Sequence, residues 1–219
     1  MPEPPAWLPA IDAASVRGTR ARGEDTDRRI LDAGRECFRR YGYAAVRIDD
    51  IVELAGTSHG SFYLYFRNKE DLFRRLAVEC SLRLRELTAA LERLPRPLDA
   101  QSLEGWVAGF VAMYQQDGPV IRVWLDNRDS DPLMLSLAND ALGPLAAALA
   151  AIIDPHLASR LDQRMAGLGL LSMLERLSSY LRDDVPEDVA TATAARLIFA
   201  TTVASDPSPG ETARWAARG

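Results

Sequence analysis

The sequence predicts an all-α protein in which an N-terminal three-helix helix-turn-helix domain precedes a larger helical domain. Apolar residues recur at every third or fourth position along most of the 219 residues, which is the spacing of one face of an α-helix. The sequence contains neither an alternating strand of usable length nor a repeat of fixed period. Near residue 56, a glycine separates two short apolar segments, as in a helix-turn-helix. An apolar fraction of 47% and a charged fraction of 26% are ordinary for a globular chain.

The first 25 residues predict a disordered N-terminal arm, because they contain four prolines and little apolar surface. Arg17, Arg20 and Arg22 would make this arm basic, although a solvated tail is the favoured interpretation. The first helical pattern starts near Thr26, which is placed as the N-cap, and ends at Gly42.

Two short helices and one long helix follow. Residues 48–55 and 59–65 are expected to form the helix-turn-helix pair, with Ser58 as the cap of the second helix. A long amphipathic helix is expected from about residue 69 to residue 94, where Pro95 ends it.

These elements place the helix-turn-helix domain at residues 26–73 and a second helical domain at residues 74–205. A disordered tail is expected at residues 206–219. The helices predicted for the second domain are 102–117, 118–127, 131–153, 157–182 and 187–204.

The residue content argues against several classes of protein. No nucleophile with a base, no paired carboxylates and no set of metal ligands stands at a suitable spacing, so we expect no enzyme, metal or cofactor. Cys37 and Cys80 lie in apolar helical stripes, which favours buried thiols in a reducing compartment over a disulfide. We find no signal peptide and no apolar stretch of membrane-spanning length, and so expect a cytoplasmic protein without a membrane partner.

The net charge of −5 is unevenly distributed along the chain. Residues 1–75 carry 13 basic and 12 acidic residues, whereas the remainder carries 13 and 19. A mildly positive front half attached to an acidic body is compatible with a nucleic-acid partner.

The run AGTSHGSFYLYFRNKEDLF has side chains suited to contact with DNA. Gly60 permits close approach of the backbone to a duplex, and Tyr63 and Tyr65 carry hydroxyls that can donate to phosphate oxygens. Lys69, the only lysine of the chain, stands at the start of the next helix. The inward face of the same short helix is expected to be Phe62 and Phe66.

The pattern G-x-F-Y-x-Y-F-x-x-K-E-x-L at Gly60 to Leu72, after the turn A-G-x-S, resembles the tetracycline-repressor (TetR) family of bacterial transcription regulators. The resemblance runs from Arg28 to Phe73, and the rest of the chain shows no matching motif. It implies an all-α second domain whose last two long helices pair across a two-fold dimer. It also implies a recognition surface and a phosphate contact, here Ser58, His59, Gly60, Ser61, Tyr63, Leu64, Tyr65 and, for the phosphate, Lys69.

Three residues depart from the family pattern. His59 stands where Lys or Arg is common, which weakens a phosphate or guanine contact. Arg47 stands where Ser or Thr usually caps the second helix, so that a cap is lost and a cation near the DNA backbone is gained. Leu64 replaces a polar reader and is suited to contact with a thymine methyl group.

The resemblance implies a ligand cavity in the second domain, and cavities of this kind are mostly apolar. Residue by residue, simple core packing is the stronger reading of the candidates. They are Trp106, Phe110, Met113, Tyr114, Trp124, Asn127 and Met134.

Small residues recur at helical spacing in the last two predicted helices, where they allow close helix approach. We therefore expect a dimer interface there, with packing inside one chain as the alternative. The residues concerned are Ala166, Gly169, Met173, Ala190, Ala194, Leu197 and Thr201.

The sequence as a whole favours a homodimeric regulator, most often a repressor in such families, that binds a palindromic DNA operator. An unknown apolar or amphipathic small molecule would release it from the operator. A DNA-binding dimer of architectural or constitutive type, without an effector, is the alternative.

Overall fold

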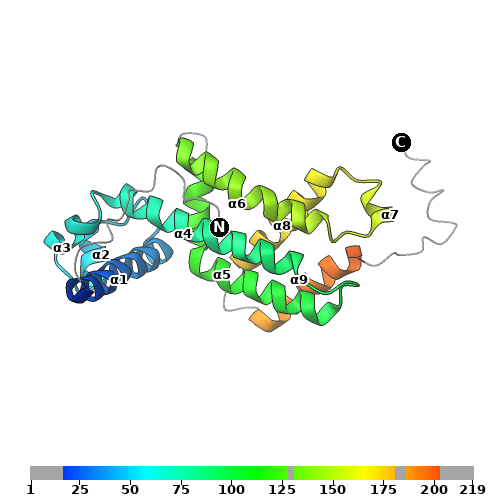
Figure 1. Cartoon of the computed structure of the whole chain (residues 1–219), viewed down its shortest axis with the longest axis horizontal. Coiled ribbons are helices and arrows are strands. Elements are labelled where there is room, and N and C mark those ends of the chain that lie inside the picture. Colours follow the sequence, from blue (N-terminus) through cyan, green and yellow to red (C-terminus); the bar gives the residue numbers. More distant parts are fainter. Residues whose placement is uncertain (1–16, 128–130, 181–185, 203–219) are drawn as a thin grey trace. The chain divides into compact units, whose positions relative to one another are not determined.

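The computed structural model describes the backbone of residues 17–127, 131–180 and 186–202, and the side chains of residues 25–126, 131–179 and 186–202. Over these ranges the chain forms nine α-helices and no strand, which confirms the all-α prediction (Figure 1). The helices are α1 (Arg17–Tyr41), α2 (Ile48–Leu54), α3 (His59–Tyr65), α4 (Lys69–Glu92), α5 (Ala100–Asn127), α6 (Pro132–Ala150), α7 (Pro155–Ala158), α8 (Gln163–Tyr180) and α9 (Glu187–Thr202).

The chain divides into two compact units, Met1–Leu72 and Phe73–Gly219. The tail expected at residues 206–219 and the first 16 residues of the expected N-terminal arm lie outside the described residues.

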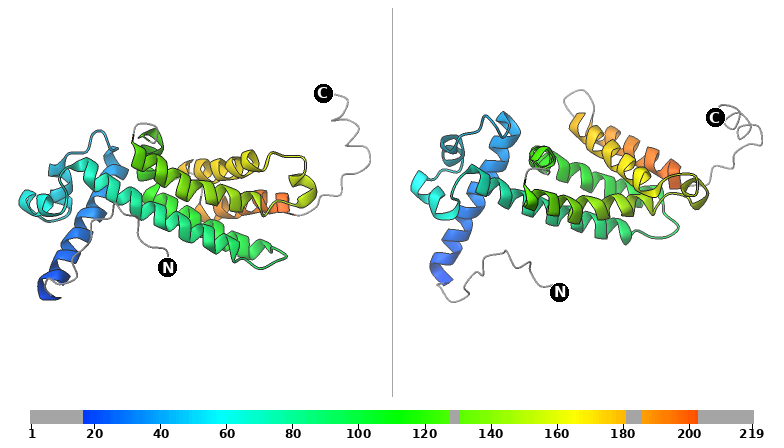
Figure 2. Two further views of the ribbon diagram at one scale, coloured as in Figure 1. Left: turned by 45° about the horizontal axis from the view of Figure 1, so that its top comes forward. Right: turned by 90° about the horizontal axis from the view of Figure 1, so that it is seen from above.

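In the first unit, α1 packs against α2 and α3 (blue to cyan in Figure 2). The core of this unit includes the buried side chains Ile30, Phe38, Ile51, Phe62 and Leu72. Two of the turns of the unit, after α1 and after α2, depend on glycines with positive φ angles, 78° at position 42 and 59° at position 56. Side chains with a Cβ rarely adopt this left-handed conformation, so a glycine is needed in each turn.

The first helix begins earlier than the sequence predicted. Residues 17–25 belong to α1, so the expected disorder of this segment is wrong, and Thr26 lies inside the helix instead of capping it. The arginines, the alanine and the glutamate of this segment are good helix formers. Further along, oppositely charged side chains one turn apart stabilise the helix, including Asp25 with Arg29 (3.2 Å) and Arg28 with Asp32 (3.9 Å). A search for apolar periodicity does not detect a helix of this polar kind.

In the second unit, α8 packs against α5 and α6, and α9 packs against α5 and α8 (Figure 2). The two tryptophans of α5 are anchored by hydrogen bonds as well as by packing. The indole of Trp106 donates to the carbonyl oxygen of Leu87 (2.8 Å), and that of Trp124 donates to the carbonyl oxygen of Met134 (2.7 Å).

Two predicted helix boundaries in this unit are wrong. The helix α5 continues through Gly118 and Pro119, where a break was expected. A proline inside a helix costs about 3 kcal/mol, but the buried residues that follow it, Val120 and Ile121, pack the segment into the core. The helix predicted at 157–182 is instead the short α7 followed by α8, because the carboxylate of Asp162 accepts from the backbone N–H of Met165 (2.9 Å) and starts a new helix.

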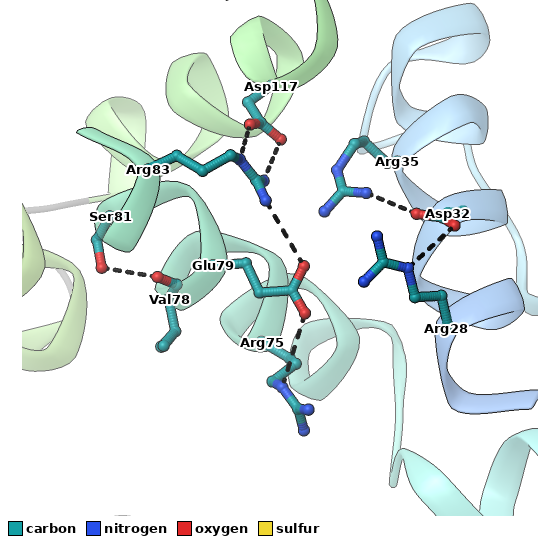
Figure 3. Close-up of polar contacts among 9 residues, drawn as sticks. All are labelled: Arg28, Asp32, Arg35, Arg75, Val78, Glu79, Ser81, Arg83 and Asp117. Carbon is teal, nitrogen blue, oxygen red and sulfur yellow. Dashed lines mark hydrogen bonds and ion pairs between the residues drawn. The ribbon is translucent and has the colours of Figure 1, made fainter. Parts of the chain in front are cut away.

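A buried ion pair joins α4 to α5 (Figure 3). The guanidinium of Arg83 donates to both carboxylate oxygens of Asp117, at 2.7 and 2.8 Å, and Asp117 is fully buried. Burial acts to lower the pKa of Arg83, but the hydrogen bonds and charge of Asp117 outweigh it and raise that pKa above its ordinary value. The pair thus fixes the register of the two helices by a charged contact inside the unit.

Among the described helices, α6 alone has the length and apolar composition of a membrane span, although no such stretch was expected. Half of its 18-residue apolar window is buried inside the protein. A core helix packed as α6 is against α8 has the same composition.

Candidate nucleic-acid interface

The helix α3 is started by a serine cap and held by two buried phenylalanines. The hydroxyl oxygen of Ser58 accepts from the backbone N–H of Ser61 (3.1 Å), which confirms the predicted cap. Phe62 and Phe66 are buried, one turn apart, with ring centroids 5.7 Å apart. These contacts leave α3 only one face to present to solvent.

The residues that the sequence predicted for the recognition surface are exposed or half-exposed, at the cap of α3 and along the helix. Tyr63 is 55% exposed and Leu64 is 81% exposed, while Tyr65 lies at the edge of the same surface. Because Leu64 is so exposed, its side chain contributes little to the packing of the unit. The remaining members are Ser58, His59, Gly60 and, half-exposed, Ser61.

Gly60 has no role in the fold that requires glycine. It lies in the first turn of α3, and a Cβ built on it would meet only the hydroxyl of Ser58, at 3.7 Å, which is an ordinary contact. The space above this position is therefore open to a partner.

An aspartate that the sequence analysis missed ties the start of α3 to the start of α2. One carboxylate oxygen of Asp49 lies 2.8 Å from Nε2 of His59, and the other lies 3.8 Å from the guanidinium of Arg47. All three side chains are exposed. In a helix-turn-helix the starts of the two helices lie close together. An acidic residue in the first turn of α2 could therefore have been predicted to meet the first residue of α3.

Arg47 does not leave α2 without a cap. Its side chain makes no capping hydrogen bond, as expected, but the carboxylate of Asp50 accepts from the backbone N–H of Arg47 (2.8 Å). This contact is half of a capping box and satisfies one donor at the helix start.

Lys69 holds the loop between α1 and α2. Its ammonium donates to the carbonyl oxygens of Tyr43 and Val46, both at 2.8 Å, with that of Ala44 at 3.5 Å. The same ammonium lies 4.6 Å from the centre of the Tyr43 ring. The expected phosphate contact of Lys69 has no support here, because an ammonium has three donors and carbonyl oxygens already receive them.

The second unit contains an open groove of about 700 Å³ between α6 and α8. None of the six predicted pocket residues with a described side chain lines it, and all six are buried core: Trp106, Phe110, Met113, Tyr114, Trp124 and Met134. The side chain of Asn127 lies outside the described residues. The groove is lined by small side chains instead. The alanines of α6 leave space there, which larger side chains would occupy.

The residues predicted for a dimer interface differ in exposure within one chain. Ala194 is buried inside the protomer, whereas Gly169 and Leu197 are exposed and Leu197 is 51% accessible. The partly exposed members are Ala166, Met173, Ala190 and Thr201.

Cys37 and Cys80 are both buried, and neither forms a disulfide within the described residues. Burial raises the pKa of the Cys37 thiol above its ordinary value, which keeps it protonated and unreactive.

Comparison with known proteins gives a family model and relatives that each match part of the chain. The family model "Bacterial regulatory proteins, tetR family" matches residues 30–76. The uncharacterized HTH-type transcriptional regulator YdgC of Bacillus subtilis is 35% identical over 72 residues, which are 33% of this chain and 37% of YdgC. The HTH-type transcriptional repressor AcnR of Corynebacterium glutamicum is 29% identical over 122 residues, or 53% of this chain and 62% of AcnR.

Solved structures share the fold over most of the chain. The transcriptional regulator FadR of Bacillus subtilis, solved in complex with stearoyl-CoA, superposes with a TM-score of 0.56 at 19% identity. The match covers 81% of this chain and 99% of FadR. At this identity the likeness establishes the arrangement of helices alone.

Proposed function

Since the chain belongs to the TetR family of bacterial regulatory proteins, we propose that it is a cytoplasmic transcriptional regulator that binds double-stranded DNA through α3. The observation that carries this proposal is the exposed face of α3, on which an 81%-exposed leucine, two tyrosines and an unobstructed glycine stand above two buried phenylalanines. A helix held in this way fits the major groove of B-DNA, which is about 12 Å wide.

The exposed residues of α3 and the nearby Arg47 are proposed to contact different parts of the DNA. Tyr63 and Tyr65 donate their hydroxyls to phosphate oxygens, and Gly60 allows the helix backbone to approach the duplex. Leu64 packs against a thymine methyl group. Arg47, whose side chain is 78% exposed, lies beside His59 and Asp49 and adds a positive charge near the DNA backbone.

In the proposed complex, Lys69 holds the loop between α1 and α2 through its hydrogen bonds and does not bind phosphate. The variant Lys69→Met keeps the aliphatic stem but removes the donors to Tyr43 and Val46. We expect a loss of about 1–3 kcal/mol in the free energy of unfolding, because carbonyl oxygens lose a charged donor. Urea unfolding measures this loss, and the slope of log operator affinity against log salt is expected to equal that of the parent.

The control for this variant is Arg93→Met, which removes one charge from an exposed residue. A salt slope lowered by about one in Lys69→Met, with unfolding unchanged, would restore the phosphate contact.

We propose further that the regulator is a homodimer in which α8 and α9 pair across a two-fold axis. Two recognition helices would then lie one helical turn of DNA apart, about 34–36 Å or a multiple, and read a palindromic operator. Repression is the favoured outcome because AcnR, which is similar to this chain over 122 residues, is a repressor by name.

The variant Leu197→Glu tests this dimer. Leu197 is 51% exposed on α9, and a two-fold axis would bring a glutamate there close to its own copy. We expect the dimer dissociation constant to rise at least about tenfold, measured by analytical ultracentrifugation. Leu82→Glu is the matched control, since Leu82 is equally exposed on α4. A monomeric parent at micromolar concentration would end the two-fold proposal, as would a variant that dimerises like the parent.

A small molecule that binds the second unit is proposed to release the operator. The groove volume of about 700 Å³ lies within the usual range for ligand sites, about 300–1,000 Å³. FadR, which shares the fold, binds stearoyl-CoA in its crystal structure. The ligand acts only through its different affinities for the DNA-binding and released conformations.

Selection of bound duplexes from a random DNA library tests the function directly. We expect enrichment of a palindromic sequence, and binding that weakens steeply between 50 and 200 mM salt. The absence of any enriched sequence would contradict the proposal. If the operator is recovered but a screen finds no molecule that weakens binding, an architectural or constitutive dimer is the better description.

A further inference from the structure

The groove between α6 and α8 is apolar over most of its length. Its walls are formed by alanines and glycine of α6, by leucines of α8, and by Leu125 of α5. The two helices approach closely beside it, since a Cβ built on Gly167 would lie 2.0 Å from the carbonyl oxygen of Ala146. Position 167 therefore has no room for a side chain, and α8 lies directly against α6 beside the groove.

One carboxylate interrupts the apolar lining. Glu175 of α8 lines the groove and is mostly buried, yet it forms no hydrogen bond or ion pair within the described residues. Burial raises the pKa of Glu175, and the neighbouring charge of Arg176 only partly opposes this. One turn further along α8, the buried hydroxyl of Ser178 also lacks a partner among the described residues.

The other charged residue of the lining lies far from Glu175 along the helix. Arg164 stands eleven residues earlier on α8, which is about 16 Å along the axis at 1.5 Å per residue. It is exposed at the other end of the groove, beside Gln163. Among the lining residues, the end of the groove at Glu175 therefore has a carboxyl group and no cationic side chain, and the adjacent Arg176 lies outside the lining.

We propose that this groove binds a lipophilic organic cation whose positive group pairs with Glu175. An apolar body would replace water along the alanine and leucine walls. A positive group would supply the counter-charge that a buried carboxylate needs. The role of such a cation as effector rests on the proposed regulatory function, whereas its binding does not.

The experiment uses two probes of nearly equal size and opposite charge, tetraphenylphosphonium and tetraphenylborate. Calorimetric titration of the full chain is expected to show binding of the cation and weaker binding of the anion. In Glu175→Gln, affinity for the cation is expected to fall at least about tenfold. Glu86→Gln, which removes an exposed carboxylate of α4, is expected to bind the cation like the parent.

The variant Glu175→Gln is expected to fold. Because its pKa is raised, the ionised carboxylate costs stability at neutral pH, and the stability present at low pH is lost as the pH rises through the folded pKa. An amide removes this cost, so the variant should melt at or above the temperature of the parent at pH 7.5. A well-folded variant makes the loss of cation binding specific to the charge.

Three outcomes would overturn the proposal. They are equal affinity of Glu175→Gln and parent for the cation, tetraphenylborate binding as tight as the cation, and no binding to the parent because a second copy covers the groove. Operator binding is then measured with and without the cation. Glu175-dependent binding that leaves operator affinity unchanged would support the site and refute its role as effector.

Discussion

Replacement of Asp117 by asparagine is expected to lower the free energy of unfolding by about 2–4 kcal/mol, the largest effect on stability that we foresee. Asp117 is fully buried and accepts two hydrogen bonds from Arg83. Its loss leaves a guanidinium on α4 without its full counter-charge. The figure is set below that for a wholly buried pair, because Arg83 is 29% exposed and water screens part of the charge.

Thermal unfolding followed by circular dichroism measures this effect, and a fall of roughly 5–15 °C in Tm corresponds to it. The double variant Arg83→Met/Asp117→Leu is the control, since an apolar pair of similar volume is often as stable as a buried ion pair. We expect it to recover most of the loss. A Tm for Asp117→Asn within about 1 °C of the parent would show that the pair does not hold α4 to α5.

Replacement of Gly60 by leucine is expected to weaken operator binding at least about 100-fold without unfolding the protein. The side chain has room in the free protein, because a Cβ at this position meets nothing closer than 3.7 Å. In the proposed complex the same side chain would separate α3 from the duplex and remove several contacts together. Helix propensity alone favours the variant by about 0.5–1 kcal/mol, so Tm should stay level or rise.

The matched control is Gly105→Leu, since Gly105 is also an exposed helical glycine with nothing near its absent Cβ. Fluorescence anisotropy on the selected operator compares the two variants with the parent. Binding by Gly60→Leu within about threefold of the parent would mean that this face of α3 does not approach DNA.

Predictions from local signals were accurate for α2, α3 and the start of α4, although not for the start of α1. The helices α2 and α3 lie within a residue of their predicted bounds, and α4 begins at the predicted residue. Each boundary depends on one or two residues whose backbone or capping chemistry is visible in the sequence, such as Gly56 with its positive φ and Ser58 with its cap. The exposed face of α3 followed from the same pattern, because placing Phe62 and Phe66 inside leaves the remaining residues outside.

Tertiary contacts were beyond the reach of the same signals. The helix α5 crosses Gly118 and Pro119 because its packing outweighs their local cost. Nothing in the spacing indicated that the ammonium of Lys69 would reach Tyr43, 26 residues earlier. The groove was also missed. The predicted pocket was built from aromatic residues, which pack in the core, whereas the groove is lined mainly by small residues of α6.

The engagement of Lys69 has a consequence for the chemical reactivity of the chain. It is the only lysine among the 219 residues, and its ammonium is held by the carbonyl oxygens of Tyr43 and Val46. A reagent that acylates side-chain amines can react with Nζ only while Nζ is released from these oxygens. The rate of acylation at this one side chain therefore reports how often the contact between Lys69 and the loop between α1 and α2 breaks.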